Sequence, residues 1–150
     1  MKGEYLGLAL EKAQIGAFKG EIPVGAVIVK DNEILAATYN RKEELNCCTK
    51  HAEILAIEEA SKKLQDWRLN DCDMYLTMEP CLMCCGALIQ SRIRNVYYVL
   101  SNDKFGGINF INYLSTFEKY NHKVNYVKVN DEKIEKELEN IMKTFFIDKR

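Results

Sequence analysis

The hydrophobic and polar positions of this chain follow two different periods. Apolar side chains recur at helical spacing over residues 4–19 and 132–146, and those of the second segment are expected to face inward. Residues 24–29 and 34–39 are instead rich in Val, Ile and Ala and flank the polar residues 30–33. This pattern predicts a β-hairpin that follows the first helix.

The middle of the chain predicts a β-α-β unit. Strands are expected over 72–78 and 95–100, with a helix over 80–91 between them. Such a crossover makes the two strands parallel and brings the start of its helix to the carboxyl ends of the strands, where α/β sheets bind ligands. A polar loop over 41–50 and a helix over 51–64 precede this unit.

With a further strand over 123–129, the elements predict one α/β domain over residues 1–150, a mixed five-stranded sheet with helices on both faces. No stretch approaches the roughly 18 uninterrupted apolar residues of a membrane span, and the N-terminus lacks the apolar region of a secretory signal. We therefore expect a cytoplasmic domain whose six cysteines are reduced. The net charge of −1 gives no global support for nucleic-acid binding.

Two short motifs carry the candidate chemistry. His51 lies at a predicted helix start, and Cys81 and Cys84 lie at the start of the next helix, where Pro80 suits the first helical position. Three residues apart, the two sulfurs share one helix face, and the helix N-terminus favours the thiolate form that binds metal. One His and two Cys make three zinc ligands. A catalytic site keeps the fourth position for water, whereas a structural site has four protein ligands.

Glu53 is expected to move protons rather than to bind the metal. Two residues past His51, its side chain points elsewhere on the first turn and can hydrogen-bond a water on the metal. Thr49 is expected to cap this helix. A Cys-x-x-Cys pair can also be a redox pair or half of a zinc ribbon. A redox pair would leave His51 and Glu53 without a role, and the other four cysteines do not supply the second pair of a ribbon: Cys47, Cys48, Cys72 and Cys85.

Further motifs extend along nearly the whole chain. They are Ile22-Pro23-Val24-Gly25-Ala26, Asn40-Arg41, His51-Ala52-Glu53, Glu79-Pro80-Cys81-Leu82-Met83-Cys84-Cys85-Gly86-Ala87, Ser91-Arg92-Ile93, Asp103-Lys104-Phe105-Gly106, Asn121-His122-Lys123-Val124 and Phe145-Phe146. In these motifs the chain resembles the bacterial tRNA-specific adenosine deaminases of the TadA type. The zinc motifs alone are typical of the wider cytidine deaminase-like superfamily. The methionine between the two cysteines, the Gly-Ala, the Ser-Arg-Ile and the double Phe narrow the resemblance to the tRNA branch.

The resemblance implies a three-layer α/β/α cytidine deaminase-like fold and a reaction. The 6-amino group of adenosine at the wobble position (34) of a tRNA anticodon would be removed by hydrolysis, giving inosine and ammonia. One Zn²⁺ per subunit would be held by the His and the two Cys. Water activated by the metal would attack C6, and Glu53 would protonate N1 and then the leaving amine.

The resemblance also implies residues that contact the substrate. Asn40 matches a residue that contacts the target nucleoside, although an Asn at a strand end is as often an ordinary turn residue. The backbone amide of Ala52 could orient the base, and Ile22 could pack on it. Phe145 and Phe146 match a terminal aromatic pair, of which we expect one ring in the nucleotide pocket and one in the core.

Contacts with the tRNA backbone are expected from basic residues. The candidates are Arg41, Lys104, Lys143, Lys149 and Arg150, each of which is, taken alone, more often a solvated surface charge. The resemblance further implies a homodimer with the helix after the second motif at its interface. Met83, Leu88 and Ile89 would equally suit a helix packed on its own sheet.

Two positions depart from the pattern of the family. Cys47-Cys48-Thr49 stands where members commonly have Asp-Pro-Thr before the metal histidine. Asn102 stands two positions before Lys104, where the family often has an acid. A carboxylate only accepts from a ribose hydroxyl, whereas Asn102 can donate as well, so we expect a weaker preference for RNA.

Two other functions remain open from the sequence. One is deamination of a free base or nucleoside, such as guanine or cytidine, by the same zinc chemistry, which the double Phe and the Ser-Arg-Ile disfavour. The other is a non-catalytic RNA-binding module with a structural zinc. Glu53 argues against this second function, because a structural site has no use for an unligated carboxylate beside an open coordination position.

Overall fold

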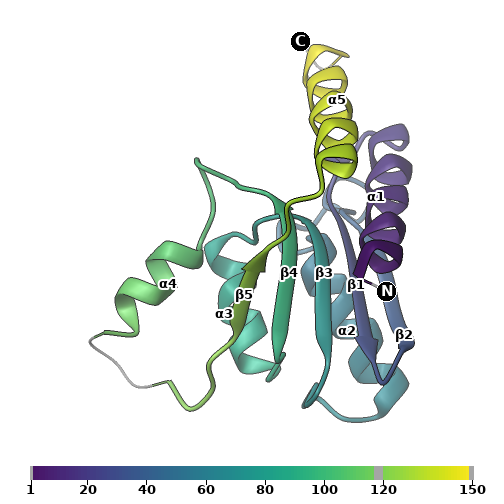
Figure 1. Ribbon diagram of the computed structural model, residues 1–150. Helices are drawn as coiled ribbons and strands as arrows, with labels where there is room; N and C mark the ends of the chain where they lie inside the picture. Colours follow the sequence, from purple (N-terminus) through teal and green to yellow (C-terminus); the bar gives the residue numbers. More distant parts are fainter. Residues whose placement is uncertain (1, 117–119, 149–150) are drawn as a thin grey trace.

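The structure is a computed structural model that describes residues 2–116 and 120–148. The elements along the chain are α1 (Lys2–Phe18), β1 (Gly25–Lys30), β2 (Glu33–Tyr39), α2 (Ala52–Leu64), β3 (Asp73–Met78), α3 (Leu82–Gln90), β4 (Asn95–Leu100), α4 (Ile108–Leu114), β5 (Asn125–Lys128) and α5 (Glu132–Asp148). The five strands form one sheet in the order β2-β1-β3-β4-β5 (Figure 1). Among the described residues, no helix is both long enough and apolar enough to cross a membrane.

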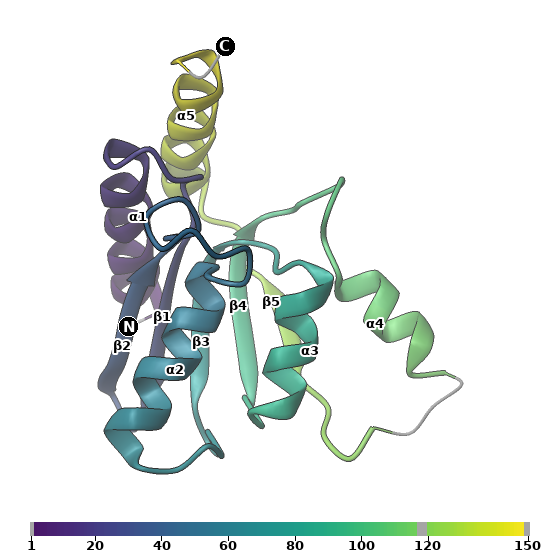
Figure 2. The same ribbon diagram turned by 180° about the vertical axis from the view of Figure 1, so that it is seen from behind.

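Helices cover both faces of the sheet, as predicted. α1 and α5 lie on one face, and α2 and α3 lie on the other with α4 beside α3 (Figures 1 and 2). Each face has its own hydrophobic cluster, one centred on α1 with Val27, Tyr75 and Leu138, and the other on α2 and α3 with Ile28 and Leu88. The last turns of α5 extend past the ends of the strands, next to the end of α1 (Figure 1).

The pairing of the strands confirms the predicted hairpin and crossover. β1 pairs antiparallel with β2 and β3, whereas β3, β4 and β5 are parallel. Asp31 and Asn32 join β1 to β2 with positive φ angles of 49° and 63°, the conformation of a two-residue hairpin turn. The carboxyl ends of β3 and β4 therefore lie at one edge of the sheet, together with the N-terminus of α3.

The close packing of α1 on the sheet depends on Gly25. A Cβ at this position would collide with the carbonyl oxygen of Ala9 on α1. The glycine in the Ile22-to-Ala26 motif thus has a structural reason, because it lets the helix backbone approach the first residue of β1.

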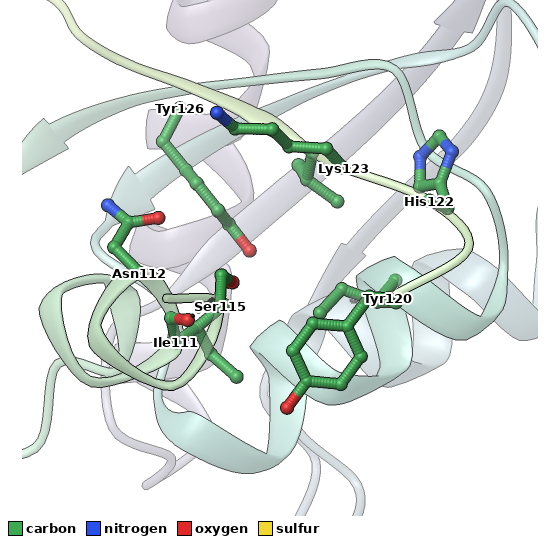
Figure 3. Close-up of a pocket in the computed structure, with 9 residues that line it drawn as sticks. Ile111, Asn112, Ser115, Tyr120, His122, Lys123 and Tyr126 are labelled. Atoms are coloured by element: carbon green, nitrogen blue, oxygen red, sulfur yellow. Dashed lines mark hydrogen bonds between the residues drawn. The ribbon is translucent and has the colours of Figure 1, made fainter. Parts of the chain in front are cut away.

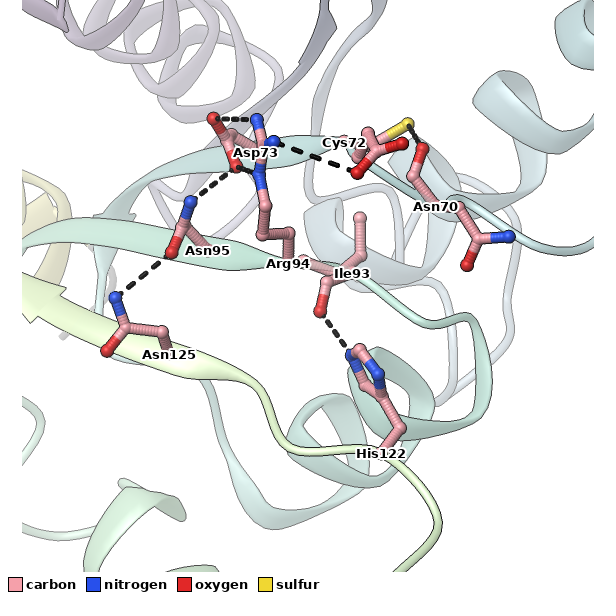
Figure 4. Close-up of polar contacts among 9 residues, drawn as sticks. Asn70, Cys72, Asp73, Ile93, Arg94, Asn95, His122 and Asn125 are labelled. Atoms are coloured by element: carbon pink, nitrogen blue, oxygen red, sulfur yellow. Dashed lines mark hydrogen bonds and ion pairs between the residues drawn. The ribbon is translucent and has the colours of Figure 1, made fainter.

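The opposite, amino-terminal edge of the sheet is closed by paired polar side chains (Figure 4). The Arg94 guanidinium donates to both carboxylate oxygens of Asp73 at 3.0 and 3.1 Å. The Asn95 amide donates to Asp73 at 2.8 Å, and the Asn125 amide donates to Asn95 at 3.0 Å. This ladder joins the first residues of β3, β4 and β5.

Two of the motifs that carry the resemblance meet at this same edge and serve the fold. The His122 Nε2–H donates to the carbonyl oxygen of Ile93 at 2.6 Å. The guanidinium of Arg92, a residue with a φ of 66°, donates to Ile89 and to Asn121, each at 3.2 Å. These bonds tie the end of α3 to the segment that leads into β5.

One expectation about the elements is wrong, and one helix was not predicted. The last strand is shorter than 123–129, because it begins only after His122 has fixed the segment before it, and it spans Asn125–Lys128. Helix α4 was not expected, because it has only seven residues, too few for a helical period to stand out in the sequence.

Candidate metal centre and substrate cavity

The predicted metal ligands meet at the N-termini of α2 and α3. His51 is the N-cap residue of α2 and Cys81 is the N-cap residue of α3, and both have extended backbone without a side-chain capping bond. The expected cap by Thr49 is wrong, because its hydroxyl pairs with the Cys47 thiol at 3.3 Å. The expected helix start at Pro80 is also wrong.

Residues 101–107 explain why α3 begins only at Leu82. The Pro80 carbonyl accepts the Gly107 N–H at 2.9 Å, and Cys81 forms an isolated β-bridge with Gly106. These contacts hold Pro80 and Cys81 extended beside the loop. A Cβ at Gly107 would lie 2.6 Å from the Cα and nitrogen of Leu82, so the loop can pass this closely only with glycine there.

The geometry of the cluster fits a tetrahedral metal. His51 Nδ1 lies 3.6 Å from the sulfurs of both Cys81 and Cys84, and the three ligand atoms all lie within 4.8 Å of one another. Zinc bonds of about 2.3 Å to sulfur and about 2.0–2.1 Å to nitrogen, at tetrahedral angles, separate N from S by roughly 3.6 Å. The three side chains can therefore hold one metal ion and leave one coordination position open.

Hydrogen bonds within the cluster prepare the Cys81 thiol, but not the Cys84 thiol, for metal binding. The pKa of Cys81 is lowered to about 4, because the Cys84 thiol and the His51 imidazole both hydrogen-bond to its sulfur. The pKa of Cys84 is raised, because it keeps the proton that it shares with Cys81 and is buried. The hydrogen bond with Cys81 also raises the pKa of His51, whereas burial of the imidazole opposes that rise.

Glu53 is buried beside the cluster with an unused oxygen. Its side chain is 4% exposed, and within the described residues its Oε1 has no hydrogen-bond partner. Burial raises the pKa of this carboxyl and favours its protonated form. An unsatisfied buried acceptor costs about 1–3 kcal/mol, so the site is built for a partner such as water or substrate. The donor set and this carboxyl together fit a metal that activates water.

A cavity of about 420 Å³ lies next to the cluster and brings together four of the predicted substrate residues. Its lining residues are Lys19, Gly20, Glu21, Ile22, Asn40, Lys42, Glu43, Phe145 and Phe146. Asn40 connects the cavity to the metal site, because its Oδ1 accepts the N–H of Ala52 at 3.0 Å. The Ala52 amide is therefore bonded to Asn40 in this structure, and its expected role in orienting the base stays a prediction.

The aromatic pair differs from its prediction. Both Phe145 and Phe146 line the cavity, with ring centroids 5.3 Å apart in an edge-to-face arrangement. The expectation that one ring packs in the core is wrong. The reason is that the last turns of α5 run past the sheet, so their apolar side chains have no strand to pack against.

Asn102 lies in the loop that passes the metal cluster. The Asn102 N–H donates to the carboxylate of Glu79 at 3.2 Å, and its side-chain oxygen accepts the Phe105 N–H at 3.1 Å. This oxygen is therefore occupied by the turn itself.

The candidate contacts with the tRNA backbone do not line the cavity. Arg41 pairs with Glu44 at 2.7 Å on the surface, and Lys104 lies over the ring of Phe105. Lys143 is exposed on α5, and Lys149 and Arg150 lie outside the described residues. Sequence reasoning missed the two lysines that do line the cavity, Lys19 and Lys42, because no motif marks them.

A second cavity, of about 310 Å³, lies between α4 and the segment around β5 (Figure 3). Tyr126 reaches into it from β5 toward Ile111 and Ser115 of α4. None of the residues proposed from the sequence for catalysis, metal binding or substrate binding lines this cavity.

Comparison with known proteins identifies the family. Residues 2–150 match the family model of the MafB19-like deaminases. The tRNA-specific adenosine deaminase of Streptococcus pyogenes serotype M1 is 44% identical over 142 residues, which cover 95% of this chain and 81% of that protein. The chain belongs to the tRNA-specific adenosine deaminases.

Solved structures of deaminases share the fold of this family member. A tRNA:A34 deaminase from a study of A-to-I editing at the wobble position superposes with a TM-score of 0.83 at 34% identity, covering 93% of this chain and 99% of the other. A guanine deaminase from Bacillus subtilis has a TM-score of 0.66 at 33% identity and covers 87% of each chain. The predicted cytidine deaminase-like fold is confirmed.

Proposed function

We propose that this deaminase converts adenosine at the wobble position (34) of a tRNA anticodon to inosine and releases ammonia, with one Zn²⁺ in each subunit. The observation that carries this proposal is the meeting of the His51, Cys81 and Cys84 cluster, the buried Glu53 and the aromatic cavity at one edge of the sheet. Similarity to tRNA-specific adenosine deaminases supplies the substrate class.

The zinc would be held by His51, Cys81 and Cys84. When bound, it supplies a Lewis acid that lowers the pKa of a coordinated water from about 15.7 toward 7. Glu53 is buried two residues from the ligand His51, and its Oε1 lacks a partner among the described residues, so this carboxyl would be the group that exchanges protons with the coordinated water.

Glu53 moves two protons in this proposal. It takes the first proton of the attacking water and gives it to N1 of adenine, where it remains in inosine. It then takes the second proton and gives it to the 6-amino group as the bond between C6 and that nitrogen breaks. Burial of the carboxyl suits this relay, since the raised pKa lets Glu53 hold a proton between the two transfers.

The cavity would hold the flipped nucleoside. Ile22 and the rings of Phe145 and Phe146 supply the apolar surface on which a base packs. Asn40, fixed by the Ala52 N–H, positions the nucleoside next to the metal ligands. An anticodon-loop base suits such a pocket because it costs less to extrude than a paired base.

Asn102 would contact the ribose of the target nucleotide. Because its side-chain oxygen is engaged by the Phe105 N–H, Asn102 can offer chiefly its amide hydrogens to a ribose hydroxyl. This supports the expectation that the chain prefers RNA over DNA less strongly than a member with an acid at this position.

We further propose a cytoplasmic homodimer. Leu88 and Ile89 are buried in the core of their own subunit, so they are not available to an interface. Leu82 and Met83, at the start of α3, are 45% and 38% exposed and offer apolar surface to a second subunit. Size-exclusion chromatography with light scattering tests the dimer, and a monomer at micromolar concentration would contradict it.

A second candidate function is deamination of free guanine, which the similarity to the Bacillus subtilis guanine deaminase favours. The experiment that separates the two gives zinc-loaded protein an anticodon stem-loop with adenosine at position 34, and free guanine, cytidine and adenosine in parallel. Nucleoside analysis and ammonia release are measured. We expect inosine in the stem-loop and little turnover of the free compounds. Turnover of guanine without inosine in the stem-loop would replace the tRNA proposal.

A further inference from the structure

One cation at the substrate cavity has no bonding partner among the described residues. Lys42 lines the cavity and is half-buried, and within the described residues its ammonium makes no hydrogen bond or ion pair. The neighbouring cations are engaged: Arg41 pairs with Glu44 at 2.7 Å, and Lys19 donates to the Tyr39 hydroxyl at 2.9 Å. Lys42 is thus the cation of this wall that a ligand can use without breaking an existing bond.

The loop that carries Lys42 is fixed by a buried carboxylate. Glu21 is 1% exposed, and its two oxygens accept the N–H groups of Glu43 at 3.0 Å and Glu44 at 2.8 Å. On the other side, the Lys42 carbonyl accepts the Cys47 N–H at 3.0 Å. Both oxygens of Glu21 are therefore used by the loop backbone, which fixes the backbone of Lys42 before a ligand binds.

Lys42 also lies on the side of the cavity that leads to the metal site. It lines the cavity together with Asn40, whose Oδ1 accepts the N–H of Ala52, the residue that follows the metal ligand His51. Lys42 therefore stands near the place where the target nucleoside would sit. Glu43 lines the same wall with an exposed carboxylate, so the wall has no excess of positive charge that would attract any anion.

From these observations we propose that Lys42 binds a backbone phosphate adjoining the target nucleoside, and that Glu21 is a positioning residue that holds Lys42 at that phosphate. The inference rests on the proposed function, because it takes a polynucleotide as the substrate. An ammonium with three donors suits a phosphate oxygen, and a free base offers no such group. Lys42 would thus help to select a nucleotide within a strand over a free base.

The first test measures binding and does not depend on deamination. Lys42→Gln is combined with Glu53→Gln, and binding of the anticodon stem-loop is measured against salt concentration. We expect roughly tenfold weaker binding and a salt slope reduced by about 1, as for the loss of one phosphate contact. Lys42→Arg should bind nearly as Lys42 does. The control is Lys62→Gln, an exposed lysine at the far end of α2, which should leave both quantities unchanged.

Stem-loops that carry one neutral methylphosphonate identify the phosphate. When the neutral group replaces one of the two phosphates that flank the target, the protein with Lys42 should bind the stem-loop about tenfold more weakly. The same replacement should leave the affinity of the Lys42→Gln protein unchanged. Equal losses in both proteins, or an unchanged salt slope in Lys42→Gln, would overturn the proposal. If these binding results are obtained but the unmodified protein, with Glu53 in place, forms no inosine, the proposed function is wrong and the phosphate site is still supported.

The role of Glu21 needs a readout other than stability. Glu21→Gln keeps the size of the side chain but turns a donor toward one of the two backbone N–H groups. We expect faster hydrogen exchange at the amides of Glu43 and Glu44, and a KM for the stem-loop raised roughly tenfold, with kcat and zinc content within about twofold. Glu11→Gln, on the exposed side of α1, is the matched control. A loss of kcat and zinc with unchanged KM would contradict the positioning role.

Discussion

Polar side chains are paired at the amino-terminal edge of the sheet, whereas one buried oxygen in the described part of the chain is left unpaired at the carboxyl-terminal edge. At the amino-terminal edge, Asp73, Arg94, Asn95 and Asn125 bond to one another in a continuous ladder. At the carboxyl-terminal edge, the buried Glu53 keeps an oxygen without a partner among the described residues. Buried polar groups in proteins are normally paired, so an unpaired one at an edge where ligands bind indicates a function rather than a contribution to stability.

The largest effect is expected from loss of a metal ligand at the carboxyl-terminal edge. Cys81→Ala should lose zinc and have no detectable deaminase activity, because three ligands are needed to hold a catalytic zinc. Metal analysis and inosine formation in the stem-loop are measured on the same sample. Cys48→Ala, which removes an exposed thiol, should keep both zinc and activity. Full activity of Cys81→Ala without metal would contradict the assignment.

A smaller loss is expected for the aromatic wall of the cavity. Phe146→Ala should raise KM for the stem-loop roughly tenfold, because stacking of a base on an aromatic ring is worth about 1–3 kcal/mol. The kcat should change little. Phe110→Ala, an exposed aromatic on α4 outside the cavity, serves as the control. An equal effect of both substitutions would mean that the cavity does not hold the base.

The amino-terminal edge should respond in stability and not in activity. Asp73→Ala removes the acceptor for both Arg94 and Asn95, so the free energy of unfolding should fall by about 1–2 kcal/mol. Denaturant unfolding measures this change. Asp71→Asn should change little, because the Asp71 side chain is 72% exposed, lies 3.8 Å from Arg94, and Asn tolerates the positive φ of 60° at this position. A large loss of kcat per folded molecule in Asp73→Ala would contradict the claim that the amino-terminal edge contributes to stability and not to activity.

The smallest effect is expected at Asn102. Asn102→Asp supplies a carboxylate that accepts from a ribose hydroxyl, so the ratio of RNA to DNA deamination should rise by a fewfold. Matched RNA and DNA hairpins are compared at equal concentration. The proposal that Asn102 weakens the preference for RNA would be contradicted if the unmodified chain already has a strict RNA preference that the variant does not change.

The sequence predicted those features that depend on short local patterns. The metal cluster was predicted because His51 and the two cysteines each stand in a short motif at the start of a predicted helix. The parallel pairing of β3 and β4 followed from the length of their connection.

Features that depend on tertiary contacts were not predicted. Lys42 and Arg41 are adjacent cations, and only the loop held by Glu21 shows that Lys42 lines the cavity while Arg41 pairs with Glu44. Likewise, the sequence does not show that the last turns of α5 extend past the ends of the strands. This extension places both Phe145 and Phe146 at the cavity.

The most direct test of the account concerns Glu53 in a site that is otherwise intact. Glu53→Gln keeps the size of the side chain but removes the group that relays protons, so inosine formation in the anticodon stem-loop should fall by about 10²- to 10⁴-fold. Zinc content and affinity for the stem-loop should remain those of the unmodified protein. Inosine formation at the unmodified rate, with zinc bound, would contradict the claim that Glu53 is the proton carrier of a zinc-dependent deaminase.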